Sequence, residues 1–258
     1  MSDLLTFYNA TIIDPVNEKV LNGSLSINLK KGTIIGQNIG LQGKSVNCRG
    51  MHLAPGIVDI GVKICEPGER HKESFRSASE SASIGGVTTL VTRADTKPAI
   101  DNPEILEFFK NRAKENSQVR VFPSAAITKK TRGKKMTEIG FLHQRGAIAF
   151  SDGLKNISNT KIFYQILKYA ADFNALIIGH PLDNFLSKKT SATTSIFSSL
   201  KGLPSSPDIA EKIGLERDIA LVENLRVRYH AYQVTTKKGL ESLRLSKRRH
   251  SNITAGTS

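Results

Sequence analysis

The stretch that decides the fold is Pro55-Gly56-Ile57-Val58-Asp59-Ile60-Gly61-Val62-Lys63-Ile64-Cys65-Glu66-Pro67-Gly68. A Pro-Gly pair opens it, an apolar run containing Asp59 follows, and Glu66-Pro67-Gly68 closes it. A short apolar run bounded by turn residues is typical of a strand, because Pro and Gly end regular structure on both sides. We therefore predict a strand at 57–62.

Beyond this strand, apolar runs alternate with amphipathic stretches to the end of the chain. The further strands are predicted at 87–92, 119–123, 147–151, 175–180 and 226–234, and a seventh opens at 253–255. The helices are predicted at 73–83, 102–116, 137–145, 159–173, 209–224 and 239–247. Glycines mark helix ends at Gly85, Gly86 and Gly146. The Ser-, Thr- and Lys-rich stretch at 187–206 is expected to be a mobile surface loop.

Strands that alternate with helices predict parallel βαβ units. Their repetition favours an α/β architecture of the (β/α)8 TIM type over an open doubly wound sheet, and no strand is followed by a dinucleotide-type glycine fingerprint. The barrel is expected to be incomplete, with about six to seven strands, since a full barrel runs to about 250 residues. A truncated product, closure by another polypeptide and an open remnant all stay open.

The first fifty residues follow a different pattern. Short strands are predicted at 5–8, 12–15, 24–29 and 33–36, and the third alternates apolar and polar residues. Such a unit is too thin to bury a core alone. We predict a small β-sandwich portion at 1–52 and the partial barrel at 53–258.

Composition narrows the class of protein. The 258 residues are 39% hydrophobic and 23% charged, which suits one globular chain of barrel size. No apolar run approaches the roughly 20 residues of a membrane span, and no signal-peptide pattern opens the chain. The two cysteines, Cys48 and Cys65, form no spaced framework, so a reducing cytoplasm is the expected location.

The chain is strongly basic, with a formal net charge of +14. Two clusters concentrate this charge, at 129–135 and 247–250. Neither cluster interleaves aromatic residues and Trp is absent, so a base-stacking surface has little support. The sequence favours solvated loops or a partner-binding patch over a nucleic-acid interface.

Several stretches together resemble the type I dihydroorotases of the amidohydrolase superfamily, and they cover almost the whole chain. These stretches are 55–68, His71-Lys72-Glu73-Ser74, Ile84–Thr89, Thr96 with Pro98 and Asp101, Gly146–Asp152, His180, Arg217-Asp218 and Tyr229–Gln233. The resemblance leans to a divergent bacterial subgroup whose site positions are also replaced. It implies a barrel that carries a binuclear zinc site.

The resemblance also implies where the metal ligands should be, and most are absent. Family histidines fall on Gly61 and Lys63, an aspartate on Gly153 and a histidine on Gln233. A sixth ligand, an aspartate on the eighth strand, falls beyond the last residue. His180 alone keeps a ligand type, whereas Asp152 and His230 occupy non-ligand positions. Since a hydrolytic site needs several imidazoles and carboxylates around the metal, no cofactor is expected.

The implied substrate pocket is altered as well. Cys65 stands where the family has a carboxylate-binding Arg, Asp95 replaces an Asn and Arg93 replaces a Met. Arg93 is not expected to replace the missing carboxylate-binding Arg, because Arg binds a carboxylate through a planar guanidinium group that must have the right orientation. Three of these residues can also be explained without a functional role. His180 would be a hydrogen-bonded side chain at a strand end, Cys65 an inert thiol and Lys63 an uncarboxylated cation.

These observations lead to a functional hypothesis. The expected protein is a dihydroorotase-like homologue that lacks catalysis, and the resemblance implies a scaffold for aspartate transcarbamoylase or another dihydroorotase-like chain in pyrimidine biosynthesis. The alternative is an active dihydroorotase, or a related cyclic-amide hydrolase, that uses zinc or a metal-free site with His180, Asp152 and His230. A degraded product without a stable fold and a nucleic-acid binder complete the set.

Overall fold

The computed structural model describes residues 3–249 and 252–257. The chain divides into two compact units, Met1–Ile57 and Val58–Ser258. Within the described residues, no helix combines the length and the apolar character that crossing a membrane requires.

The first unit is a five-stranded sheet around a small apolar cluster. Its strands are β1 Leu4–Asp14, β2 Lys19–Asn28, β3 Thr33–Gln37, β4 Lys44–Asn47 and β5 His52–Leu53. The order is β3-β2-β1-β4, and β5 also pairs with β1. Ala10, Ile12 and Cys48 are buried at its centre. The two predicted strands at 5–8 and 12–15 are one strand, because the left-handed residue Asn9 makes a bulge within β1 instead of a turn.

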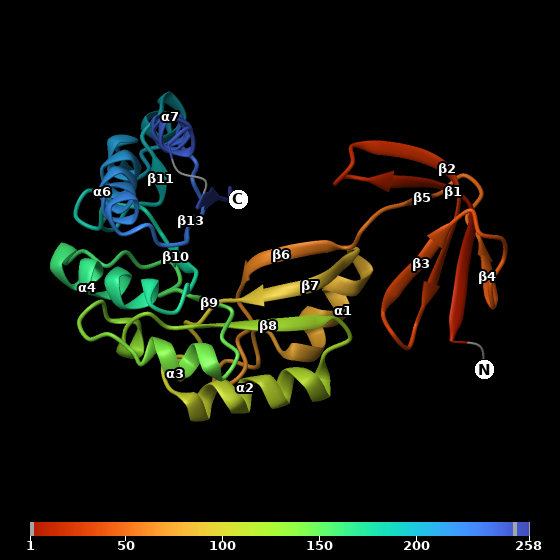
Figure 1. The fold of residues 1–258 in the computed structure, drawn as a ribbon. Helices are drawn as coiled ribbons and strands as arrows, with labels where there is room; N and C mark the ends of the chain where they lie inside the picture. The colour runs from red at the N-terminus through yellow and green to blue at the C-terminus, as the bar shows by residue number, and fades with distance from the viewer. Residues whose placement is uncertain (1–2, 250–251, 258) are drawn as a thin grey trace. The chain divides into compact units, whose positions relative to one another are not determined.

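The second unit is a curved seven-stranded sheet with helices packed against it (Figure 1). Its strands are β6 Ile57–Val62, β7 Val87–Thr92, β8 Arg120–Ala125, β9 Ala149–Phe150, β10 Ile177–Gly179, β13 Tyr229–Ala231 and β14 Ile253–Ala255. They lie in chain order from β6 to β14, and every pairing with a defined register is parallel. This confirms the α/β half of a TIM-type barrel, including the predicted seventh strand.

The helices follow the strands as the sequence predicts. They are α1 Phe75–Ile84, α2 Pro103–Asn116, α3 Ile139–Gln144, α4 Thr160–Ala171, α6 Ile209–Leu225 and α7 Lys237–Lys247. Four of them begin after a capping side chain, from Ser74, Asn102, Asn159 and Thr236. Such caps satisfy backbone N–H groups of the first turn and so fix where a helix starts. One continuous core, including Phe109, Phe150, Ile166 and Tyr229, joins helices and sheet.

The stretch at 187–206 differs from the prediction of a plain surface loop. It contains the short helix α5 Ile196–Leu200, capped by Ser195, between the paired strands β11 Ala192–Thr193 and β12 Ser205–Ser206. The serines and threonines that suggested a loop are the residues that make this cap and these turns.

Glu66 shows what the Glu66-Pro67-Gly68 end of the opening stretch does in the fold. Its buried carboxylate accepts hydrogen bonds from the N–H of Phe75 at 3.2 Å and from Nη2 of Arg112 at 2.8 Å. Burial alone would raise the pKa of Glu66, but these hydrogen bonds outweigh it and lower that pKa. Glu66 therefore ties the end of β6 to α1 and α2 and acts as framework.

Candidate functional site

The carboxyl ends of the parallel strands form the mouth of the half-barrel, where βα barrels carry their chemistry. Gly61 and Lys63 reach it from β6, Arg93 and Asp95 from β7, Gly153 from β9, His180 from β10 and Tyr232 from β13. The structure thus brings most of the sequence-predicted site residues to one place. What they form there is not the set of ligands that the resemblance implies.

Gly61 leaves room that Tyr232 occupies. A Cβ on Gly61 would lie 2.5 Å from the hydroxyl oxygen of Tyr232, and Gly61 has a φ of +92°, where side chains are strained. The Tyr232 hydroxyl donates a hydrogen bond to the Gly61 carbonyl at 3.2 Å, which links the end of β13 to β6. The space expected for a metal-binding imidazole is therefore occupied by the ring of Tyr232, which follows β13, a strand near the opposite edge of the sheet from β6.

Gly153 likewise has no room for a ligand side chain, because Asp95 occupies the space beside it. A Cβ there would lie 2.8 Å from Cγ of Asp95, and the φ of Gly153 is +73°. The Asp95 carboxylate is itself bound by Arg93, with contacts of 2.9 and 2.6 Å, and by Nζ of Lys63 at 3.5 Å. The cavity left between Gly61, Arg93, Gly153 and Tyr232 measures about 10 Å³, which is about the least that one water molecule needs.

The mouth, where the family resemblance implies two metal ions, thus contains two cationic side chains. Lys63 and Arg93 flank Asp95, so the positive charge at the mouth comes from side chains. Among the residues that the structure describes, no three His, Cys, Asp or Glu side chains converge as a metal site would require. The residues present do not fit a binuclear zinc centre.

Asp152 and His230 are engaged in structural hydrogen bonds. The Asp152 carboxylate accepts from the N–H groups of Ile127 and Thr128, both at 2.9 Å, and from the Thr128 hydroxyl. Burial nevertheless raises the pKa of Asp152. His230 shares a hydrogen bond with the Thr254 hydroxyl at 2.9 Å. Within the described part of the chain, His180, Asp152 and His230 do not come together as a three-residue group that could hold a metal ion.

His180 interacts with the backbone of Tyr232, but one of its two ring nitrogens lacks a partner within the described part of the chain. Its Nδ1 atom is buried and has no hydrogen-bond partner among the described residues. Burial lowers the pKa of His180 and outweighs the hydrogen bond to the Tyr232 backbone, which acts in the opposite direction, and the charge of Arg93 adds to the lowering. The lowered pKa favours the neutral imidazole. A lone neutral imidazole offers one metal bond at most.

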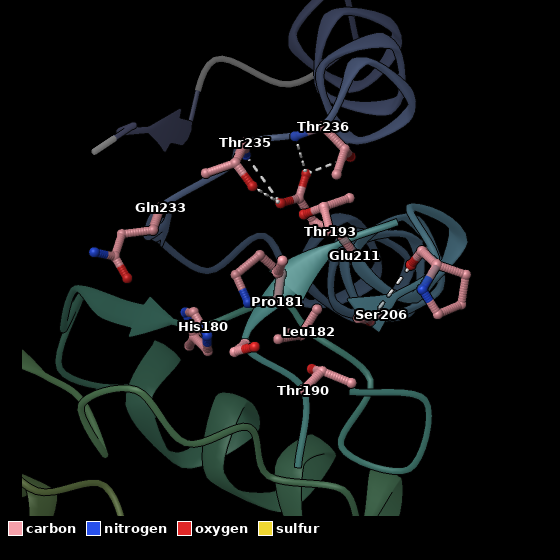
Figure 2. A pocket seen from close by; sticks show the side chains of 13 residues that line it. His180, Pro181, Leu182, Thr190, Thr193, Ser206, Glu211, Gln233, Thr235 and Thr236 are labelled. Carbon is pink, nitrogen blue, oxygen red and sulfur yellow. Dashed lines mark hydrogen bonds between the residues drawn. The ribbon is translucent and has the colours of Figure 1, made fainter. Parts of the chain in front are cut away.

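His180 also lines a cavity of about 280 Å³ beside the mouth (Figure 2). Its wall includes Gln233, whose backbone is left-handed at φ +59°, and hydroxyl groups from the segment that contains β11 and β12. The lining residues are His180, Pro181, Leu182, Thr190, Ser191, Ala192, Thr193, Ser206, Pro207, Glu211, Gln233, Thr235 and Thr236. The lining mixes polar and apolar groups about equally, and the cavity can hold a small hydrogen-bonding molecule.

Glu211 organises the side of this cavity next to α7. Its buried carboxylate accepts four hydrogen bonds, from the N–H and hydroxyl groups of Thr235 and Thr236, at 2.6 to 2.9 Å (Figure 2). Gly239 permits this approach, since a Cβ there would lie 2.2 Å from Oε1 of Glu211. Sequence reasoning missed both Glu211 and Tyr232, because their roles depend on residues that are distant along the chain.

The two buried histidines predict how stability depends on pH. Burial depresses the pKa of both His180 and His230 below 6.5, so the unfolded chain binds more protons than the folded one as pH falls through 6.5. The free energy of unfolding should therefore decrease on acidification from roughly pH 7.5 to 5.5. We expect His180→Gln to flatten this decrease. Urea unfolding across this range measures it; equal slopes for wild type and His180→Gln would contradict it.

Comparison of the sequence with known proteins shows to which family the chain is similar. The sequence model of a family described as Dihydro-orotase-like matches residues 50–239. Dihydroorotase of Syntrophus aciditrophicus (strain SB) is 34% identical over 251 residues, 95% of this chain and 58% of that protein. A dihydroorotase-like protein of Pseudomonas putida is 33% identical over 92% of this chain and 56% of its own length. This chain spans less than two thirds of the length of these relatives.

Among solved structures, an L-hydantoinase from Arthrobacter aurescens superposes with a TM-score of 0.82. It is 17% identical, and the match covers all of this chain and 58% of the other. A D-hydantoinase structure matches with a TM-score of 0.77 at 19% identity. At such identities the likeness concerns the fold alone, and it agrees with the barrel architecture described above.

Proposed function

Since this chain belongs to the dihydroorotase-like family, we propose that it is a non-catalytic member, a pseudoenzyme of pyrimidine biosynthesis. Its role would be that of a scaffold for aspartate transcarbamoylase or for another dihydroorotase-like chain. The single observation that supports the loss of catalysis is the occupied mouth of the half-barrel. Tyr232 fills the space at Gly61 and Asp95 fills the space at Gly153.

The physical argument concerns space and charge together. A hydrolytic metal needs an open coordination position and several anionic or neutral donors, because it must hold and acidify a water molecule. Here the remaining cavity is about 10 Å³, and its neighbours Lys63 and Arg93 are cations. A zinc ion would have to displace an ion pair, and it would gain at most one imidazole in exchange.

The direct test is metal content together with activity. We expect the purified chain to carry far less than one zinc per molecule and to show no ring opening of dihydroorotate or ring closure of carbamoyl aspartate. Added zinc should leave the unfolding free energy unchanged, whereas a site filled at 100 times its Kd would add about 2.7 kcal/mol. A dihydroorotase from a relative with a full ligand set serves as the positive control. Stoichiometric zinc, or turnover at ordinary enzyme rates, would refute the proposal.

The second candidate function is hydrolysis of a cyclic amide at the neighbouring cavity, and one observation favours it. His180 has a buried Nδ1 atom without a described partner and lines a cavity of about 280 Å³ with mixed polar and apolar walls. A neutral imidazole with a lowered pKa can act as a general base. Activity that survives chelation and disappears in His180→Gln would support this candidate over the scaffold.

A further inference from the structure

Residues 128–136, here called the basic loop, form a closed turn after β8. Thr128 and Met136 face each other in an isolated antiparallel bridge, and the N–H of Lys129 donates to the Lys135 carbonyl at 2.7 Å. The loop leaves and re-enters the fold at one point. Backbone hydrogen bonding at its base therefore holds the loop closed.

Two buried carboxylates accept hydrogen bonds from backbone N–H groups of this loop. Asp152 accepts from the Thr128 N–H at 2.9 Å, and Asp101 accepts from the Lys130 N–H at 2.8 Å. Lys155 adds a third attachment, with Nζ 3.1 Å from the carbonyl oxygen of Thr131. The acids of this region thus bind backbone and lie inside, so they do not face the exposed cations of the loop.

The exposed side chains of the loop are cations without partners. Residues 128–136 contain five Lys and Arg and no acid. Lys130, Arg132, Lys134 and Lys135 are exposed, and none of them takes part in the ion pairs found among the described residues. The nearest acid in sequence, Glu138, is exposed outside the loop. In the other basic cluster, by contrast, Arg249 pairs with Glu223 at 3.4 Å.

The backbone of the loop cannot serve as a small-anion cradle. The N–H groups of Thr131 and Arg132 donate to carbonyls within the loop, and the N–H of Gly133 donates to the Thr128 hydroxyl. Anion-binding turns need such groups free and converging. Only side-chain charges are left, and they are spread over several residues. This arrangement fits an extended anionic surface better than a single phosphate.

We propose that the basic loop is a preformed docking surface for an acidic patch on a protein partner. Like charges held close together disfavour the folded state, and complementary charge on a partner relieves that cost and speeds association. The absence of aromatic residues from the loop argues against single-stranded nucleic acid, whose bases need stacking platforms. The inference rests on the proposed scaffold function for the identity of the partner, and it names the surface that such a scaffold uses.

The first test uses labelled poly-L-glutamate as the probe and fluorescence anisotropy of the full chain as the measurement. The variant is Lys134→Glu/Lys135→Glu, and the matched control is Lys30→Glu/Lys31→Glu, an exposed lysine pair with the same change of charge. At low salt we expect the loop variant to bind about tenfold more weakly and the control to change little. Equal losses in both variants would overturn the proposal. Tighter binding of a single-stranded oligonucleotide, lost only in the loop variant, would also overturn it.

Two further measurements separate the possible failures. The melting temperature of the loop variant should equal or exceed that of wild type, because the substitution removes repulsion. In co-elution with aspartate transcarbamoylase, wild type and control should form a complex that the loop variant does not. If no complex forms at all, the scaffold function fails while the polyglutamate result still judges the loop. A complex that survives in the loop variant overturns the loop as its docking surface.

Discussion

Replacing Gly153 by Asp, which puts back the ligand that the family resemblance implies, is expected to lower the free energy of unfolding by about 3 kcal/mol. Part of this cost is backbone strain, since φ is +73° and a left-handed conformation costs about 1 to 2 kcal/mol for most residues. The rest comes from Asp95, whose Cγ would lie 2.8 Å from the new Cβ. A second carboxylate there would push Asp95 away from Arg93 and repel it electrostatically.

The matched control for this experiment is Gly86→Asp. Gly86 has nearly the same φ, +77°, but a Cβ there would meet no atom within 4 Å. It should therefore show the strain alone, about 1 kcal/mol. Urea unfolding of both variants, with and without zinc, measures the difference. If Gly153→Asp were as stable as Gly86→Asp, or were strengthened specifically by zinc, the mouth would be a latent metal site and not a filled one.

Removal of the Glu211 carboxylate is the second substitution with a large expected effect. Glu211→Ala should cost at least about 3 kcal/mol, because four hydrogen bonds to Thr235 and Thr236 are lost and a hydrogen bond to a charged group contributes about 1.5 to 3 kcal/mol net of its exchange with water. Thr236 caps α7 through the Gly239 N–H, so the start of that helix should loosen as well. Thermal unfolding and amide exchange at the start of α7 measure the two effects.

Asp208→Ala provides the comparison for Glu211→Ala. Asp208 is the residue before α6 and pairs with Lys238 of α7 at 2.9 Å, but each side chain is a little under half exposed. Exposed ion pairs contribute about 0 to 1 kcal/mol. Each of the two substitutions removes one carboxylate between α6 and the start of α7, so the comparison isolates the effect of burial and hydrogen bonding. A cost below about 1 kcal/mol for Glu211→Ala would show that water replaces its hydrogen bonds and that Glu211 does not organise the cavity.

The predicted elements of the second unit agree with the structure because their signals are local. The apolar run at 57–62 is β6, and the stretch at 253–255 is β14. Asn102 and Asn159 end the preceding segments and cap α2 and α4, which the sequence shows as polar residues before apolar periodicity. The stretch at 187–206 was wrongly predicted as a plain loop, since cap-forming and loop-forming residues are the same types.

The candidate site was predictable only as a set of losses. Glycine at positions 61 and 153 shows that no ligand side chain is present, whatever the fold. The sequence does not show what takes the vacated space, because Tyr232 lies 171 residues from Gly61 along the chain. It also does not distinguish the buried Asp152 from an available carboxylate. That distinction depends on hydrogen bonds from Ile127 and Thr128.

The sequence by itself determined the order of strands and helices, the family frame around Glu66 and the absence of ligands at Gly61, Lys63, Gly153 and Gln233. These properties follow from periodicity, turn residues and side-chain chemistry, which act within a few residues. Only the tertiary structure decided that the mouth is filled by Tyr232 and by the Lys63–Asp95–Arg93 group, and that the basic loop carries unpaired charge. Packing and ion pairing join residues that are distant in sequence, so they are set by where the sheet brings side chains together and not by local pattern.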